Sequence, residues 1–170
     1  MGKPLKQGEK VEKGGLLKVS RKSFLGILLP EWNARLVLSP GSQLEVDFDS
    51  KEGKKILIKK GALRWTSLKL GDSEKLKRKS KKGFLFTSHA KVVIRGTDFF
   101  LQIGSAFQET ELVVLDGKIL FQSLSDEDDY VVLKSPFWVG LGGRFSSKIG
   151  KPIKLNQKTE SFYHLILSFK

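Results

Sequence analysis

The feature that most constrains this chain is a side-chain pattern that repeats every two residues and is interrupted at short intervals by turn signals. Apolar residues alternate with polar ones, or β-branched and aromatic residues cluster, in the segments 34–39, 43–48, 55–60, 91–95, 117–122 and 130–134. This period is typical of half-buried strands, whose successive side chains point to opposite faces of a sheet. Turn-forming residues stand between the segments, at 39–42, 52–53, 116–117 and 140–143. They leave too little room for helices of ordinary length, so the pattern predicts an all-β protein.

Length and composition predict that these strands form one domain. The chain has 170 residues, of which 39% are hydrophobic, and this is enough apolar material for a single core. Many short strands at similar spacing fit either a β-solenoid-like fold or a twisted β-sandwich, and periodicity does not separate the two. We expect an N-terminal tail over 1–13, the domain itself over 14–155, and a C-terminal strand over 156–170 that completes it.

One hairpin is predicted locally. The segments 112–115 and 118–121 flank Asp116-Gly117, and an Asp-Gly pair supplies the positive φ angles that a two-residue hairpin turn demands. We therefore expect these two strands to pair with each other.

The net charge favours an anionic partner. The chain carries 31 Lys and Arg against 18 Asp and Glu, a formal charge of +13, which fits nucleic acid, anionic lipid, acidic glycan or cell-wall polymer equally well. It has no cysteine, which excludes disulfides and thiolate metal sites. No run approaches the ~20 apolar residues that a transmembrane helix needs.

Two segments depart from the strand pattern by their charge. The run 69–82 holds seven Lys or Arg and two acidic residues, so we read 69–83 as a solvated loop inserted between two β segments. The alternative is an anion- or partner-binding loop, with the candidate residues Lys75, Lys77, Arg78, Lys79, Lys81 and Lys82. The acidic run 126–129 lacks the ligand spacing of an EF-hand loop and is read as a polar turn.

Five short sequence elements follow one another along the chain between Ala34 and Gln122. They are an apolar strand that ends in a Ser-Pro-Gly-Ser turn, a strand–Gly61–strand unit, a phenylalanine strand over Phe84–Thr87, a Gly-Thr-x-Phe element at Gly96, Thr97 and Phe99, and a Val-Leu-x-Gly element at Val114, Leu115 and Gly117. In this order the chain resembles the FecR domain family over roughly 14–122, with a continuation to 155.

The residues that carry this resemblance have a structural role of their own. Gly96 lies where one strand gives way to another, so we expect a backbone angle closed to other residues, with Thr97 hydrogen-bonding the turn and Phe99 pointing inward. Together with Arg95, Asp98, Asp116 and Gly117 these residues are interpreted as a structural motif. The alternative for Arg95 and Asp98 is a ligand site.

The resemblance also implies a cellular role. FecR regulators relay the occupancy of an outer-membrane transporter to a sigma factor through an anti-sigma segment, a membrane helix, this domain and a C-terminal part. Because we expect neither of the first two parts before Gly14, the favoured function is a non-catalytic binding or scaffold module of the bacterial cell envelope that contacts protein or anionic cell-wall polymer. The alternatives are a FecR-type signalling module with its other segments absent, or a basic nucleic-acid-binding protein. The expected location is the periplasm or envelope, which assumes a removed signal peptide, with the cytoplasm as the alternative.

No catalytic, cofactor or metal site is predicted. The two histidines, His89 and His164, lie in a turn and in the closing strand, and Ser88 beside His89 lacks the neighbours of a hydrolase nucleophile. Gly140–Arg144 lacks the Lys-Ser or Lys-Thr ending of a phosphate loop and is read as a turn. Trp32, Trp65 and Trp138 are expected in or near the core, rather than on a stacking platform for sugars or bases.

Overall fold

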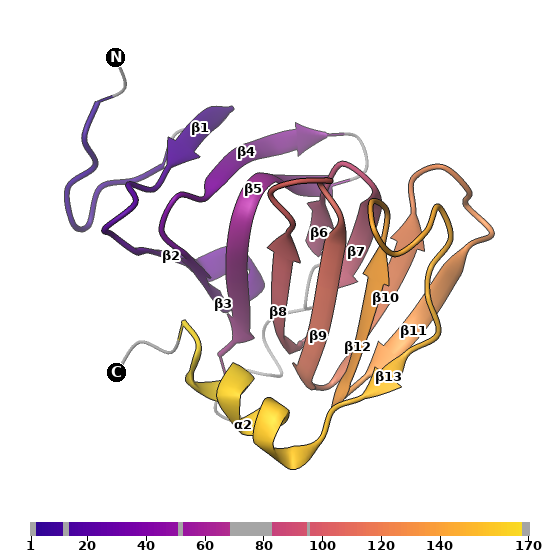
Figure 1. Ribbon diagram of the computed structural model, residues 1–170. Coiled ribbons are helices and arrows are strands. Elements are labelled where there is room, and N and C mark those ends of the chain that lie inside the picture. The colour runs from indigo at the N-terminus through magenta and orange to yellow at the C-terminus, as the bar shows by residue number, and fades with distance from the viewer. Residues whose placement is uncertain (1–2, 12–13, 51–52, 69–82, 95, 168–170) are drawn as a thin grey trace, which may run out of the picture.

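The computed structural model describes residues 3–11, 14–50, 53–68, 83–94 and 96–167. These residues form thirteen strands and one short α-helix, and the strands join in a curled mixed sheet shaped as a half-barrel (Figure 1). The expectation of an all-β protein is therefore confirmed. The predicted strands recur close to their expected limits.

One long strand, β5 (Gly53–Ser67), joins the two halves of the sheet. Its first part pairs with β4 and β6, and its second part, from Gly61 onward, pairs with β3 and β8. Gly61 has a φ of +90°, and a Cβ at this position would lie 2.7 Å from the Cα of Ser42. Neither the backbone angle nor the space admits a side chain there, so glycine is what lets the strand pass from one half to the other.

We call these halves the first and the second half-sheet. Beside the first part of β5, the first half-sheet contains β1 (Gly15–Lys18), β4 (Gln43–Ser50), β6 (Gly83–Phe86), β7 (Ala90–Ile94), β10 (Lys118–Ser123) and β11 (Tyr130–Lys134). The second contains β2 (Leu25–Leu29), β3 (Ala34–Leu38), β8 (Asp98–Ile103), β9 (Thr110–Asp116), β12 (Phe137–Leu141) and β13 (Ile153–Lys154). A short 3-10 turn, η1 (Pro30–Trp32), links β2 to β3. Among these strands only β5 and β6 pair in parallel, whereas a solenoid pairs its stacked rungs in parallel. The arrangement is therefore the curled, sandwich-like one of the two that periodicity left open.

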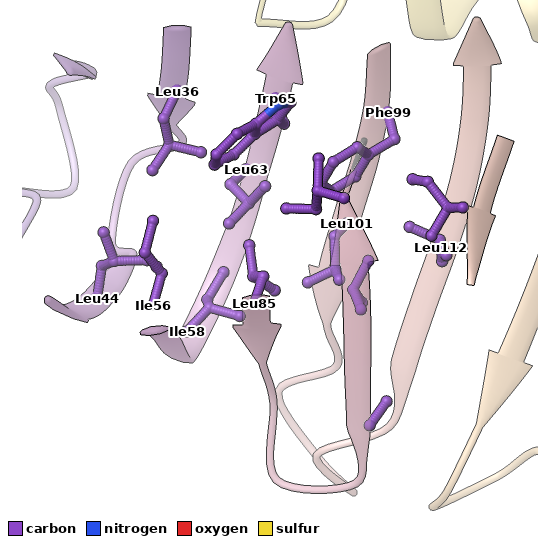
Figure 2. Packing of buried hydrophobic residues seen from close by; sticks show 14 of the residues in the cluster. Leu36, Leu44, Ile56, Ile58, Leu63, Trp65, Leu85, Phe99, Leu101 and Leu112 are labelled. Atoms are coloured by element: carbon purple, nitrogen blue, oxygen red, sulfur yellow. The ribbon is translucent and has the colours of Figure 1, made fainter. Parts of the chain in front are cut away.

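The half-sheets face each other across one core. Figure 2 shows Leu44, Ile56, Ile58 and Leu85 of the first half-sheet and Leu36, Leu63, Leu101 and Leu112 of the second in the same cluster. The rings of Trp65 and Phe99 stack within it at a centroid distance of 6.1 Å, and Trp32 lies 5.4 Å from Trp65. Trp138 is half-buried against a second apolar cluster. All three tryptophans thus lie in or beside packed interiors, as predicted.

The C-terminal segment is a helix, so the prediction of a closing strand over 156–170 was wrong. Helix α2 (Gln157–Leu165) begins at Asn156, whose side chain accepts a hydrogen bond from the Thr159 amide. Tyr163 of α2, and Ile166 and Leu167 just beyond its end, pack on the outer face of the second half-sheet. Neither α2 nor any other helix in the described part of the chain is long and apolar enough to cross a membrane.

The predicted hairpin around Asp116-Gly117 was also wrong. Strand β9 pairs with β8 and β12 in the second half-sheet, whereas β10 pairs with β7 and β11 in the first. A hairpin turn of the Asp-Gly type needs positive φ at both central residues, but only Gly117 has it, at +81°. The chain therefore uses Gly117 to cross between half-sheets instead of folding back on itself.

Candidate functional site

The residues of the predicted structural motif lie at two adjacent crossovers between the half-sheets. Gly96 and Thr97 lead from β7 to β8, and Gly117 leads from β9 to β10. Gly96 has a φ of +63°, which confirms the predicted backbone angle. A Cβ on Gly117 would lie 2.9 Å from the Cγ2 of Thr97, so the two crossovers pack directly on each other.

Backbone hydrogen bonds hold the first crossover. The Thr97 amide donates to the Ser67 hydroxyl at 2.9 Å, and the Thr97 carbonyl accepts from the Ser67 amide at 3.0 Å. Within the described residues the Thr97 hydroxyl itself has no hydrogen-bond partner, so the expected side-chain bond to the turn is not formed. Phe99 points into the core as predicted. Arg95 lies outside the described residues.

Asp98 belongs to an ion pair that the sequence did not reveal. Its carboxylate accepts from Arg64 Nε at 3.0 Å and from Nη2 at 2.8 Å, a two-point contact, and the two side chains are only 17% and 9% exposed. Arg64 Nη1 also donates to the carbonyls of His164 and Ile166, at the end of α2. A cation there satisfies carbonyls that the helix leaves unpaired. The Arg64–Asp98 pair therefore anchors α2 to the sheet, and the Asp98 carboxylate is engaged in this ion pair.

Tyr163 shows how closely α2 is seated. Its ring lies 5.2 Å from that of Phe100, centroid to centroid. Burial raises the pKa of the Tyr163 phenol above its ordinary value, and the negative charge of Glu111 adds to the effect.

A polar pocket opens beside the turn between β6 and β7. It has a volume of about 430 Å³ and is lined by Ser88, His89, Ser123, Leu124, Ser125, Leu141, Gly142, Gly143, Ser146 and Ser147. The imidazole of His89 sits against Gly142, where a Cβ would approach its Cδ2 to 2.7 Å. The hydroxyls of Ser123 and Ser125 are 2.9 Å apart, and Ser88 donates to the Gln108 carbonyl. In this pocket His89 lies among several serine residues.

The glycine-rich run beside the pocket is partly strand and partly turn. Gly140 and Leu141 end β12, and the turn predicted for this run spans Gly142–Phe145. Arg144 in this turn contacts the carboxylates of Glu109 and Glu111, at 3.2 Å and 2.5 Å. Glu109 is buried, and within the described residues its second carboxylate oxygen has no hydrogen-bond partner. This cluster fixes the turn to the start of β9.

The pocket does not contain the arrangement that acid–base or nucleophilic catalysis needs. Such a site requires a nucleophile, a base within hydrogen-bond reach and a group that orients the base. Among the described residues no side chain hydrogen-bonds the His89 imidazole, and His164 lies on α2 rather than beside it. Over the same residues no group of three or more His, Asp or Glu is placed to hold a metal ion. The pocket is lined by serine hydroxyls together with the apolar side chains of Leu124 and Leu141.

Comparison with known proteins gives one consistent result. No family model matches the sequence, and no curated protein matches it either. Two crystal structures of a putative anti-sigma factor from Parabacteroides distasonis ATCC 8503, at 2.50 and 1.65 Å resolution, superpose with a TM-score of 0.61 and 14% identity. The present chain resembles that protein in fold.

The likeness covers most of this chain and part of the other. It extends over 88% of the present residues and 64% of the Parabacteroides distasonis protein, so this chain spans less than two thirds of the protein it matches. At 14% identity the match establishes the fold alone. The match is consistent with the resemblance to the FecR family, for which a signalling module is the alternative function.

The candidate anion-binding residues remain a prediction. Lys75, Lys77, Arg78, Lys79, Lys81 and Lys82 lie outside the described residues, and so does nearly all of the predicted loop over 69–83. The sequence missed Arg64, although a charged residue between Leu63 and Trp65 in an apolar strand signals a buried partner.

Proposed function

We propose that this chain is a protein-binding module, without catalytic activity, of a FecR-type regulator that controls a sigma factor. The observation that carries the proposal is the superposition on a putative anti-sigma factor over 88% of the chain. It favours the signalling alternative over a scaffold that contacts cell-wall polymer. The proposed location is the periplasm or the cell envelope, where a FecR domain meets its partners.

The residues singled out above have structural roles. The largely buried ion pair of Arg64 and Asp98 ties α2 to the sheet, and the Gly96 and Gly117 crossovers serve the fold. The pocket at His89 lacks a base and orienting group among the described residues. The nucleic-acid alternative rests on the net charge and on the basic run over 69–82, and both are compatible with many anionic partners.

The experiment deletes the gene in its native host and sequences the transcripts. We expect the genes of one sigma factor to change together, to recover when the full gene is restored, and to stop responding when that sigma factor is also deleted. Fractionation of a tagged protein is expected to find it in the envelope.

A variant of His89 tests whether this residue has a catalytic role in regulation. His89→Gln keeps a polar side chain of similar length against Gly142 and should restore regulation fully. Loss of regulation by a folded His89→Gln protein contradicts the non-catalytic role, and an unchanged transcript profile in the deletion strain contradicts sigma-factor control.

A further inference from the structure

The outer faces of the two half-sheets differ in how they are covered. On the second half-sheet, Ala62, Phe100, Val113 and Leu115 are buried beneath the C-terminal segment, which contributes Leu155, Tyr163 of α2, Ile166 and Leu167. On the first half-sheet, six apolar or aromatic residues of β6, β7, β10 and β11 face outward and belong to neither apolar cluster of the described residues: Phe84, Phe86, Val93, Leu120, Tyr130 and Val132. We call this surface the outer face of the first half-sheet.

Strand register turns part of this surface into a continuous apolar row. Val132 is the cross-strand partner of Leu120, Leu120 of Val93, and Val93 of Phe84. Four strands at the usual spacing of about 4.8 Å make a row roughly 14 Å long. An α-helix of about ten residues has that length, which is close to the nine residues of α2 on the opposite side.

Lysines frame the row. Lys118 and Lys134 are exposed cross-strand partners, and Lys91 lies over the Phe84 ring with its Nζ 5.2 Å from the centroid. The outward residues of these four strands include three lysines and no Asp or Glu. Like charges directly opposite each other on a sheet repel, and a carboxylate placed between them relieves the repulsion.

We infer that this face docks an acidic amphipathic helix of a partner protein, with its apolar stripe on the row from Val132 to Phe84 and its carboxylates on the lysines. The inference rests on the proposed protein-binding function and names its contact surface. The molecule already covers its other sheet face with a C-terminal segment that includes a helix, through Tyr163 of α2 and through Ile166 and Leu167 that follow it. The side chains on this face are most exposed on the edge strand β11, where Tyr130 is 59% and Val132 is 51% exposed. A partner that covers them removes apolar surface from water.

The test uses a synthetic 14-residue peptide with leucines at helical spacing and glutamates on both flanks. Its control is the same peptide with lysines in place of the glutamates. Binding to the ¹⁵N-labelled full chain is followed by amide chemical shifts. We expect the acidic peptide to bind and to shift residues of β6, β7, β10 and β11, and the basic peptide not to bind.

Charge-reversal variants make the test specific. Lys118→Glu/Lys134→Glu should weaken binding of the acidic peptide about tenfold. Each exposed lysine–glutamate pair contributes modestly to binding, and the variant reverses the charge of two lysines. Lys151→Glu/Lys154→Glu makes the same change in net charge at exposed positions near β13 and should leave binding unchanged. Equal loss in both variants, shifts elsewhere, self-association through this face in sedimentation, or preference for anionic lipid vesicles over the peptide would each overturn the inference.

Regulation in the host distinguishes this inference from the function on which it rests. If the Lys118→Glu/Lys134→Glu protein no longer binds the peptide but fully restores sigma-dependent transcription in the deletion strain, the inferred docking face is wrong and the proposed function stands. If the deletion itself leaves transcription unchanged, the proposed function fails, whatever the peptide does.

Discussion

Gly61→Ala should destabilise the protein more than Gly96→Ala, although both replace a glycine of positive φ by the same residue. At Gly96, with φ at +63°, no atom lies within 4 Å of an added Cβ, so the cost is backbone strain of about 1–2 kcal/mol. At Gly61 the strain is joined by a clash with Ser42, whose Cα lies 2.7 Å from the added Cβ. Ser42 is buried and hydrogen-bonded to Ala62, so it cannot move aside freely. Overpacking adds about 1–3 kcal/mol, for a total of about 2–5 kcal/mol at Gly61.

The assays are thermal and urea unfolding of both variants and the parent chain, each monitored by tryptophan fluorescence. Trp65 lies in the core cluster, so its emission reports loss of the packed interior. For a chain of this size each kcal/mol shifts the melting temperature by roughly 2–4 °C, so Gly61→Ala should melt well below Gly96→Ala. Equal melting temperatures, with equal urea dependence, would refute the idea that β5 needs glycine for close approach as well as for its backbone angle.

Three further predictions concern α2 and its anchor. Asp98→Ala should cost about 3–5 kcal/mol because it leaves the Arg64 guanidinium without its partner, and hydrogen exchange should show α2 less protected; a fully protected helix would contradict the anchoring role. Asn156→Ala removes the N-cap bond and should lower the free energy of unfolding by about 1 kcal/mol in urea titrations, whereas an unchanged value would mean that packing alone holds the helix. The pKa of Tyr163 is raised by burial and by Glu111, so the folded state keeps the proton longer, and stability should fall as pH rises above about 10. Tyr163→Phe should weaken that decline, which urea titrations at pH 9 and 11 will measure.

The sequence identified the strands because their signal is local. A period of two in apolar residues reflects which face of a strand is buried, and in β3 the alternate residues Ala34, Leu36 and Leu38 are buried in the core cluster. Positive φ at Gly96 was equally predictable, since glycine adopts that backbone angle without the steric cost that a side chain brings to a bend between two strands.

The sequence did not predict which side chains contact one another, because a side chain's partners come from distant parts of the chain. Arg64 and Asp98 are 34 residues apart, and Arg64 meets the carbonyl of His164 across 100 residues. His89 faces a pocket wall supplied by the turn at Gly142. No spacing in the sequence encodes such meetings, because they depend on the order of strands in the sheet.

The sequence by itself determined that this chain is built of strands with alternating faces and glycine-dependent bends. Only the tertiary structure decided which strands pair. Asp116-Gly117 allows a hairpin, yet β9 and β10 separate because each gains two other neighbours in its own half-sheet. The C-terminal segment was expected as a strand, but it forms a helix with an N-cap at Asn156, and Tyr163, Ile166 and Leu167 pack on the second half-sheet. Strand identity follows from neighbouring residues, whereas pairing and coverage follow from the burial of surfaces that meet only in the folded chain.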